Sequence, residues 1–218
     1  MELFKYCRAA HMQSAREFGS VRIGTLSDYG KTDKYGEYVS DAKEGTKKLS
    51  GSVPELSFEN ISQYPGLQGF ISLVPGAKIK NLVFTDNVVG APDLLIFSAS
   101  SKYDSNIHNR WFVEEGYDAC YRITSAEHFL GAISEALGKE FRFLGYREVV
   151  YADDIHIVDP KSAIHPAFVK RQSHHIEQSE IRAAWAHVSE NPITPIILQQ
   201  SNVNMYVCPH ATLATDEA

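Results

Sequence analysis

Short apolar runs separated by turn residues dominate the sequence from residue 69 onward. Leu94-Leu95-Ile96-Phe97 is continuously apolar, as in a strand buried on both faces. Pro75-Gly76 and Gly90-Ala91-Pro92 stand between such runs and are typical turn sequences. Runs this short and this often interrupted favour strands over helices, so the chain is constrained to a fold built mainly on β-sheet.

The same pattern predicts where the elements lie. Helices are expected at residues 9–18, ending at Gly19, and at 124–137, where Thr124 and Glu127 fit a capping box. A third, short helix is expected within 159–168. Strands are expected at residues 2–7, 20–26, 69–74, 78–85, 93–98, 117–123, 146–151, 155–158, 181–188, 195–199 and 203–208. The prediction is an α+β fold with a mostly antiparallel sheet of about ten strands and two or three helices.

Composition excludes several classes. With 218 residues, 44% apolar and 22% charged, the chain is expected to fold, and as one domain over residues 1–218. No run reaches the roughly 18 apolar residues of a membrane-spanning helix, and the start lacks a signal-peptide pattern. A net charge of −6 does not favour a dedicated nucleic-acid binder. Three widely spaced cysteines, Cys7, Cys120 and Cys208, indicate free thiols and a cytoplasmic location.

Residues 28–54 differ in character from the rest, and we expect a long surface excursion there. The segment is rich in Lys, Asp, Gly and Ser and carries Tyr29, Tyr35 and Tyr38. Two interpretations stay open: a functional loop, or a loop that its aromatic residues merely pin to the body. Its lysines and tyrosines also suit a nucleic-acid acceptor, but nearby acids largely cancel the charge. Residues 210–218 are expected to be a flexible tail.

Nine histidines are present, but the potential ligand residues do not show the spacing that is typical of metal sites. His174-His175 are adjacent, so on a strand they would point to opposite faces. Cys208-Pro209-His210 offers two ligands without a second pair nearby. No HExxH, CxxC, GxGxxG, Walker or GxSxG motif occurs. We therefore expect no metal.

A carboxylate and an amide stand two residues apart at Gln178 and Glu180, just before the apolar run 181–185. In extended backbone such residues share a face. The carboxylate can then stabilise positive charge developing on a sugar, and the amide can orient a second reactant. The alternative is a solvated stretch in which Glu180 or Glu177 pairs with Arg182.

Two other places add polar groups at strand ends. Ser98 and Ser100 close the buried run 94–97, where hydroxyls can line a polar cleft or simply terminate a strand. Arg8 follows the first strand, where a guanidinium can bind phosphate in bidentate fashion or lie on the surface.

Arg8, Ser98-Ala99-Ser100 and Gln178-Ser179-Glu180 together resemble the ADP-ribosyltransferase superfamily in its Arg–Ser–Glu arrangement. The resemblance implies a split β-sheet core and an enzyme that consumes NAD, by ADP-ribosyl transfer to a protein or nucleic-acid acceptor or by NAD glycohydrolysis. It assigns nicotinamide-ribose binding and transition-state stabilisation to Glu180.

The remaining roles also follow from this resemblance. Ser98 or Ser100 would position Glu180, and Gln178 would orient the acceptor. Arg8 would bind the pyrophosphate, with Arg22 as its substitute should Arg8 lie beyond the strand. The tyrosines of the excursion, Tyr29 and Tyr35 among them, would cover the nicotinamide or contact the acceptor.

Over most of its length the chain also resembles a family of uncharacterised bacterial and phage-associated proteins. The matching pieces are Leu3-Phe4-Lys5-Tyr6, Arg22-Ile23-Gly24-Thr25-Leu26, Asp41-Ala42-Lys43-Glu44-Gly45, Tyr117-Asp118-Ala119-Cys120 and Glu180-Ile181-Arg182 after Lys170. This resemblance suggests a phage-defence or toxin setting. Two alternatives remain: a non-catalytic sensor that binds a nucleotide or a protein, and a metal-dependent nuclease or hydrolase using Asp41, Glu44 and histidines with a divalent metal.

Overall fold

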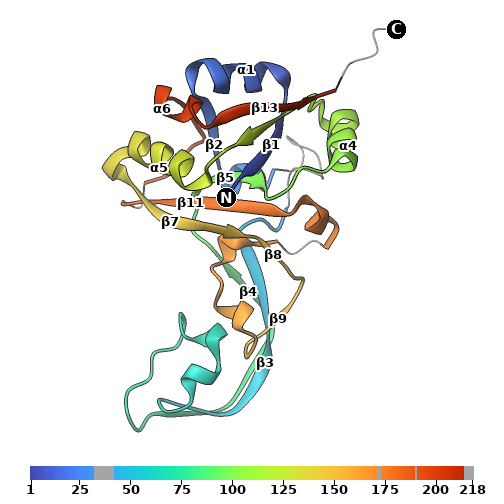
Figure 1. The fold of residues 1–218 in the computed structure, drawn as a ribbon. Coiled ribbons are helices and arrows are strands. Elements are labelled where there is room, and N and C mark those ends of the chain that lie inside the picture. The colour runs from blue at the N-terminus through green and yellow to red at the C-terminus, as the bar shows by residue number, and fades with distance from the viewer. Residues whose placement is uncertain (32–41, 171–172, 190, 214–218) are drawn as a thin grey trace. The chain divides into compact units, whose positions relative to one another are not determined.

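The computed structural model describes residues 1–31, 42–170, 173–189 and 191–213 (Figure 1). The chain groups into two compact units, whereas the sequence led us to expect one domain. Unit 1 comprises Met1–Ala42, Asp93–Val149 and His175–Ala218, and unit 2 comprises Lys43–Pro92 and Val150–His174.

Unit 1 contains an eight-stranded sheet in which every strand pairing is antiparallel. The order is β12-β2-β5-β1-β6-β13, and β11 pairs with both β5 and β7. The strands are β1 (Leu3–Cys7), β2 (Ser20–Thr25), β5 (Leu95–Ser100), β6 (Ala119–Ile123), β7 (Phe141–Glu148), β11 (Glu180–His187), β12 (Ile196–Gln199) and β13 (Val207–Thr212). The predicted α+β class and mostly antiparallel sheet are confirmed.

The two edges of β5 are used differently. On one edge β11 pairs along the whole strand, from Leu95 to Ser100. The other edge is shared, because β2 pairs at Leu95 and Ile96 and β1 pairs at Ser100. The neighbouring strands therefore part around Ser98, in the middle of β5.

Five α-helices occur in the described residues: α1 (Ala9–Phe18), α2 (Leu26–Tyr29), α4 (Ser105–Glu115), α5 (Ala126–Leu137) and α6 (Ser201–Asn204). Gly19 ends α1 with a left-handed φ of 60°, as predicted. The apolar stripe of α5 packs in the core of unit 1. Its predicted capping box is wrong, since the N-cap is Ser125 and makes no side-chain capping bond. The sequence did not predict α4, which Asp104 caps through the amides of Asn106 and Ile107.

Unit 2 is built on a long hairpin of β3 (Thr46–Ser57) and β4 (Lys78–Gly90). Its other strands are β9 (Ile155–His156), parallel to β3, and the parallel pair β8 (Val150–Tyr151) and β10 (Val169–Lys170). Residues 46–54 are thus strand, which corrects the predicted 28–54 excursion. The strand predicted at 69–74 does not form. The backbone there is irregular, and Ile71 and Leu73 pack against the unit 2 core from it.

Three other boundaries differ from prediction. The strand expected at 146–151 is divided between β7 and β8, which belong to different units. The one expected at 203–208 is divided between α6 and β13, and β13 extends three residues into the predicted tail. In place of the short helix expected within 159–168 the chain forms two 3-10 turns, Pro160–Ala163 and Pro166–Phe168. Among the described residues no helix is long and apolar enough to cross a membrane.

Candidate functional site

The structure brings Ser98 and Glu180 together across the β5–β11 pair. The hydroxyl of Ser98 donates a hydrogen bond of 2.6 Å to Oε1 of Glu180. Glu180 opens β11 and is 6% exposed. Because residues 98, 100, 180 and 182 alternate with core-facing neighbours, their side chains share the sheet face opposite the apolar core. The predicted serine strand and carboxylate therefore meet inside the protein.

Arg182 completes this contact from the same strand. Its Nε and Nη2 each lie 2.9 Å from Oε1 of Glu180, and the residue is 1% exposed. The ion pair that we considered as an alternative therefore forms, but it is buried rather than solvated. Buried charges are tolerated when they are paired and hydrogen-bonded, and this pair meets both conditions.

Lys5 supports Ser98 from the other side. Its ammonium donates a bond of 2.6 Å to the backbone carbonyl of Ser98, at the point where β1 and β2 part. The ammonium also lies 5.2 Å from the ring centroid of Phe97. The Lys5 side chain thus bonds the Ser98 carbonyl on an edge of β5 where β1 pairs only at Ser100.

Gln178 and Ser100 are linked through the backbone, not through the predicted shared strand face. Gln178 is buried as the last residue of a 3-10 helix, Ser173–Gln178, and its carbonyl accepts a 2.8 Å bond from the Ser100 hydroxyl. Ser179 has a left-handed φ of 46°. Its carbonyl accepts from the Ser101 amide at 2.9 Å. The expectation of extended backbone across 178–180 is therefore wrong, because the chain turns at Ser179.

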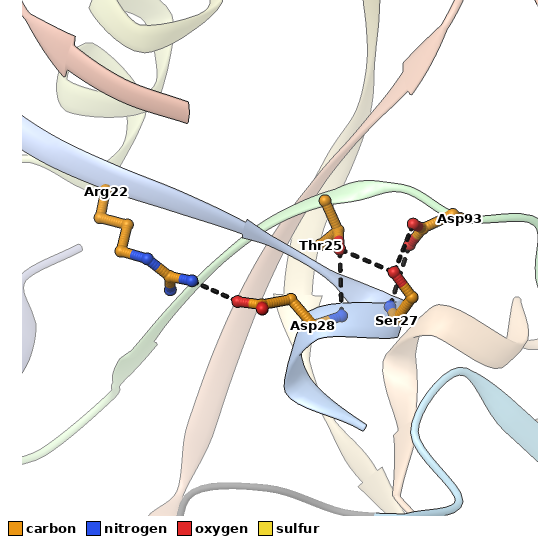
Figure 2. A network of polar contacts seen from close by, with 5 residues as sticks. All are labelled: Arg22, Thr25, Ser27, Asp28 and Asp93. Carbon is orange, nitrogen blue, oxygen red and sulfur yellow. Dashed lines mark hydrogen bonds and ion pairs between the residues drawn. The ribbon is translucent and has the colours of Figure 1, made fainter. Parts of the chain in front are cut away.

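Figure 2 shows how polar contacts fix α2 beside β2. The Thr25 hydroxyl accepts from the Asp28 amide at 3.1 Å, and Asp93 receives bonds from both the amide and the hydroxyl of Ser27 at 3.0 and 2.6 Å. Arg22, on β2, forms an ion pair with the buried carboxylate of Asp28. Arg22, which the resemblance offers as the substitute for Arg8 in phosphate binding, thus already has an acidic partner.

The contacts between α2 and β2 place Tyr29, the last residue of α2, against β2. Its ring lies 6.0 Å from the Arg22 guanidinium carbon, and a Cβ at Gly24 would come within 2.6 Å of the ring. Burial raises the pKa of Tyr29 to about 12; Arg22 and Arg182 act to lower it, and Glu180 to raise it. Tyr29 therefore lies within electrostatic range of the Glu180–Arg182 pair.

Arg8 is exposed and follows the last residue of β1, so the predicted departure from the strand occurs. It occupies the N-cap position of α1, where the Ala9 amide donates 2.6 Å to Asp118. Its charge lowers the pKa of Tyr117, which burial raises more strongly. Arg22 lowers the pKa of Tyr117 as well, so this tyrosine lies within electrostatic range of both arginines.

Some predicted residues fall elsewhere. Tyr35 and Asp41 lie outside the described residues, as do the side chains of His174 and His175. Glu44 belongs to unit 2 and accepts a bond from the Gly45 amide at 3.2 Å. In the part of the chain that the structure describes, no group of three or more His, Cys, Asp or Glu residues is placed to hold a metal ion.

Sequence reasoning missed Lys5 and Tyr117, and it placed the pairing of Arg182 with Glu180 on a solvated stretch rather than in the interior. Arg182 carried a signal, since a charged residue inside an apolar strand, two positions after a glutamate, indicates a buried pair. Lys5 and Tyr117 carried none, because their contacts depend on how β1 pairs with β5 on one edge and with β6 on the other. Comparison with protein-family models, with curated proteins and with solved structures found no match to this chain.

Proposed function

We propose that the chain is an NAD-consuming enzyme that releases nicotinamide at the Ser98–Glu180 contact. The observation that carries the proposal is the 2.6 Å hydrogen bond from the Ser98 hydroxyl to a buried glutamate. A carboxylate held in a fixed orientation away from bulk water stabilises developing positive charge more effectively than a solvated one. The ADP-ribosyltransferase resemblance supplies the chemistry that uses such a group.

In the proposed reaction, the bond between the nicotinamide nitrogen and the ribose carbon breaks. Its electron pair leaves with nicotinamide, and positive charge develops on the ribose ring. The carboxylate of Glu180 stabilises that charge and holds the ribose hydroxyls. Water or an acceptor nucleophile then bonds to the ribose carbon and loses a proton. The two outcomes are NAD glycohydrolysis and ADP-ribosyl transfer.

Phosphate binding is assigned to Arg8 in preference to Arg22. Arg8 is exposed, whereas Arg22 is engaged by the buried Asp28. A guanidinium matches phosphate oxygens in bidentate geometry. Tyr117 lies within electrostatic range of both arginines and Tyr29 within that of Arg22, and both tyrosines offer ring faces for a base.

The test is incubation of the purified protein with NAD, followed by chromatographic measurement of free nicotinamide. Release in buffer alone supports glycohydrolysis, and release only with protein or nucleic-acid fractions supports transfer. Absence of release under both conditions contradicts the proposal.

A second candidate is a non-catalytic protein that binds a nucleotide and reports its presence. The observation that favours it is that Oε1 of Glu180 already accepts from Ser98 and from two nitrogens of Arg182. Such an ion pair can serve structure alone. A thermal shift on adding NAD without nicotinamide release supports binding without turnover.

A further inference from the structure

We propose that Arg182 is a positioning residue, which holds the carboxylate of Glu180 in the orientation that the reaction requires. This inference rests on the proposed function. Glu180 and Arg182 are two residues apart on β11 and share a sheet face. Arg182 therefore acts on Glu180 within one strand, whatever the rest of the site contributes.

The geometry of the contact restricts rotation of the carboxylate. Arg182 approaches Oε1 with Nε and Nη2, each at 2.9 Å, while the Ser98 hydroxyl reaches the same oxygen at 2.6 Å. Donors arriving from β11 and from β5 hold that oxygen from two directions. Rotation about the carboxylate bond would break all of these bonds at once, so the second oxygen also keeps a defined position.

Stability alone gives little reason for this arrangement. A buried ion pair can usually be replaced by apolar residues at no net loss of stability. Arg182 also lies directly opposite Arg147 on β7, and like charges at opposed positions are unfavourable. An arginine retained against this repulsion is better explained by orientation of its partner.

The neighbourhood of the pair agrees with a role in the site. Both charges of the pair act on Tyr29, the tyrosine that α2 places beside β2. The backbone of Arg182 pairs with Ser98 on β5 and with Arg147 on β7 in the strand register. Arg182 thus connects the site to the middle of the sheet rather than to a mobile surface.

The test is a double-mutant cycle on nicotinamide release, with wild type, Arg182→Lys, Glu180→Gln and the double variant. Lysine keeps the charge but lacks the planar fork that donates from two nitrogens. We expect Arg182→Lys to lower kcat by about 10- to 100-fold with little change in KM, as misplacement of a reacting group does. In the Glu180→Gln background the same change should lower the residual rate no further, which labelled NAD makes measurable.

Arg147→Lys is the matched control, since this residue opposes Arg182 on the sheet but is exposed, and it should behave as wild type. Equal losses from Arg182→Lys in both backgrounds, or a loss confined to KM, would overturn the positioning role alone. A wild type that releases no nicotinamide would overturn the proposed function, and this inference with it. Arg182→Gln replaces the lysine variant if that protein does not fold.

Discussion

The Ser98 hydroxyl donates a 2.6 Å hydrogen bond to the carboxylate of Glu180, which lies 82 positions later in the chain. The pairing of β5 with β11 creates this contact, because Arg182 opposes Ser98 and Glu180 opposes Ser100. The hydroxyl therefore reaches diagonally to the neighbouring position. This bond distinguishes the two serines that the sequence left equivalent.

Ser98→Ala and Ser100→Ala should consequently have different effects. Loss of the Ser98 hydroxyl removes a donor from Glu180, so we expect nicotinamide release to fall by roughly tenfold, the effect of about 1.4 kcal/mol. The Ser100 hydroxyl bonds to the Gln178 carbonyl, and its loss should lower stability by about 1 kcal/mol with a smaller effect on rate. Steady-state kinetics and urea unfolding of both variants check this. Equal kinetic effects would show that Ser98 has no special role.

Replacing one member of the buried ion pair should cost more than replacing both. We expect Arg182→Met to lower the free energy of unfolding by about 3–5 kcal/mol, because it leaves a buried carboxylate without its guanidinium. Adding Glu180→Met to the same chain should restore most of that loss. Urea unfolding followed by tryptophan fluorescence measures this in unit 1, which holds both tryptophans, Trp111 and Trp185. Additive losses would contradict the pairing.

The left-handed backbone at Ser179, with φ of 46°, gives a prediction about strain. Glycine adopts this conformation freely, whereas β-branched residues rarely do. Ser179→Gly should therefore leave stability unchanged or raise it by up to about 1 kcal/mol, and Ser179→Val should lower it by about 1–2 kcal/mol. Thermal unfolding of both variants provides the comparison. A valine variant as stable as wild type would mean that residue 179 is extended.

His108 should make stability depend on pH. Burial lowers its pKa below 6.5, outweighing the raising effects of the Tyr117 backbone and Asp118, while His210 lowers it further. The unfolded chain then takes up a proton at a higher pH than the folded chain does. Its contribution to stability is complete above about pH 6.5 and declines by up to about 1.4 kcal/mol per pH unit below that.

His108→Phe should flatten this dependence between pH 7 and the folded pKa, although it also loses the 3.1 Å contact with the Tyr103 hydroxyl. His11→Gln, on the exposed face of α1, is the control and should keep the wild-type slope. Urea unfolding at several pH values measures both. An unchanged slope in His108→Phe would show that another group is responsible.

Much of unit 1 could be predicted because its signals are local. The alternation in β1, the apolar run 94–97 and the Gly19 stop of α1 each depend on neighbouring residues only. The order of Arg8, Ser98 and Glu180 along the chain was equally visible. Local patterns therefore predicted the class of fold and named Ser98 and Glu180, whose side chains are hydrogen-bonded in the structure.

The rest depends on long-range packing. Lys47 is buried with its ammonium bonded to the Ser162 and Ile164 carbonyls, so a lysine that suggested a solvated loop is part of β3. The left-handed turn at Ser179 could not be predicted, because the position holds serine rather than the glycine that usually marks such a turn. The Glu180–Arg182 pair was visible as spacing, but its burial was not. Sequence spacing alone does not show which neighbours cover a residue.

The central claim is tested most directly by comparing nicotinamide release from NAD by wild type, Glu180→Gln and Glu177→Gln. Glutamine keeps an oxygen to accept the bonds from Ser98 and Arg182 but lacks the charge that stabilises the ribose cation. The control carboxylate, Glu177, has a side chain that is 62% exposed and pairs with Arg110 at the surface. We predict that Glu180→Gln lowers the rate by at least about 100-fold, while Glu177→Gln stays within about twofold of wild type. Release by Glu180→Gln at the wild-type rate would contradict the account.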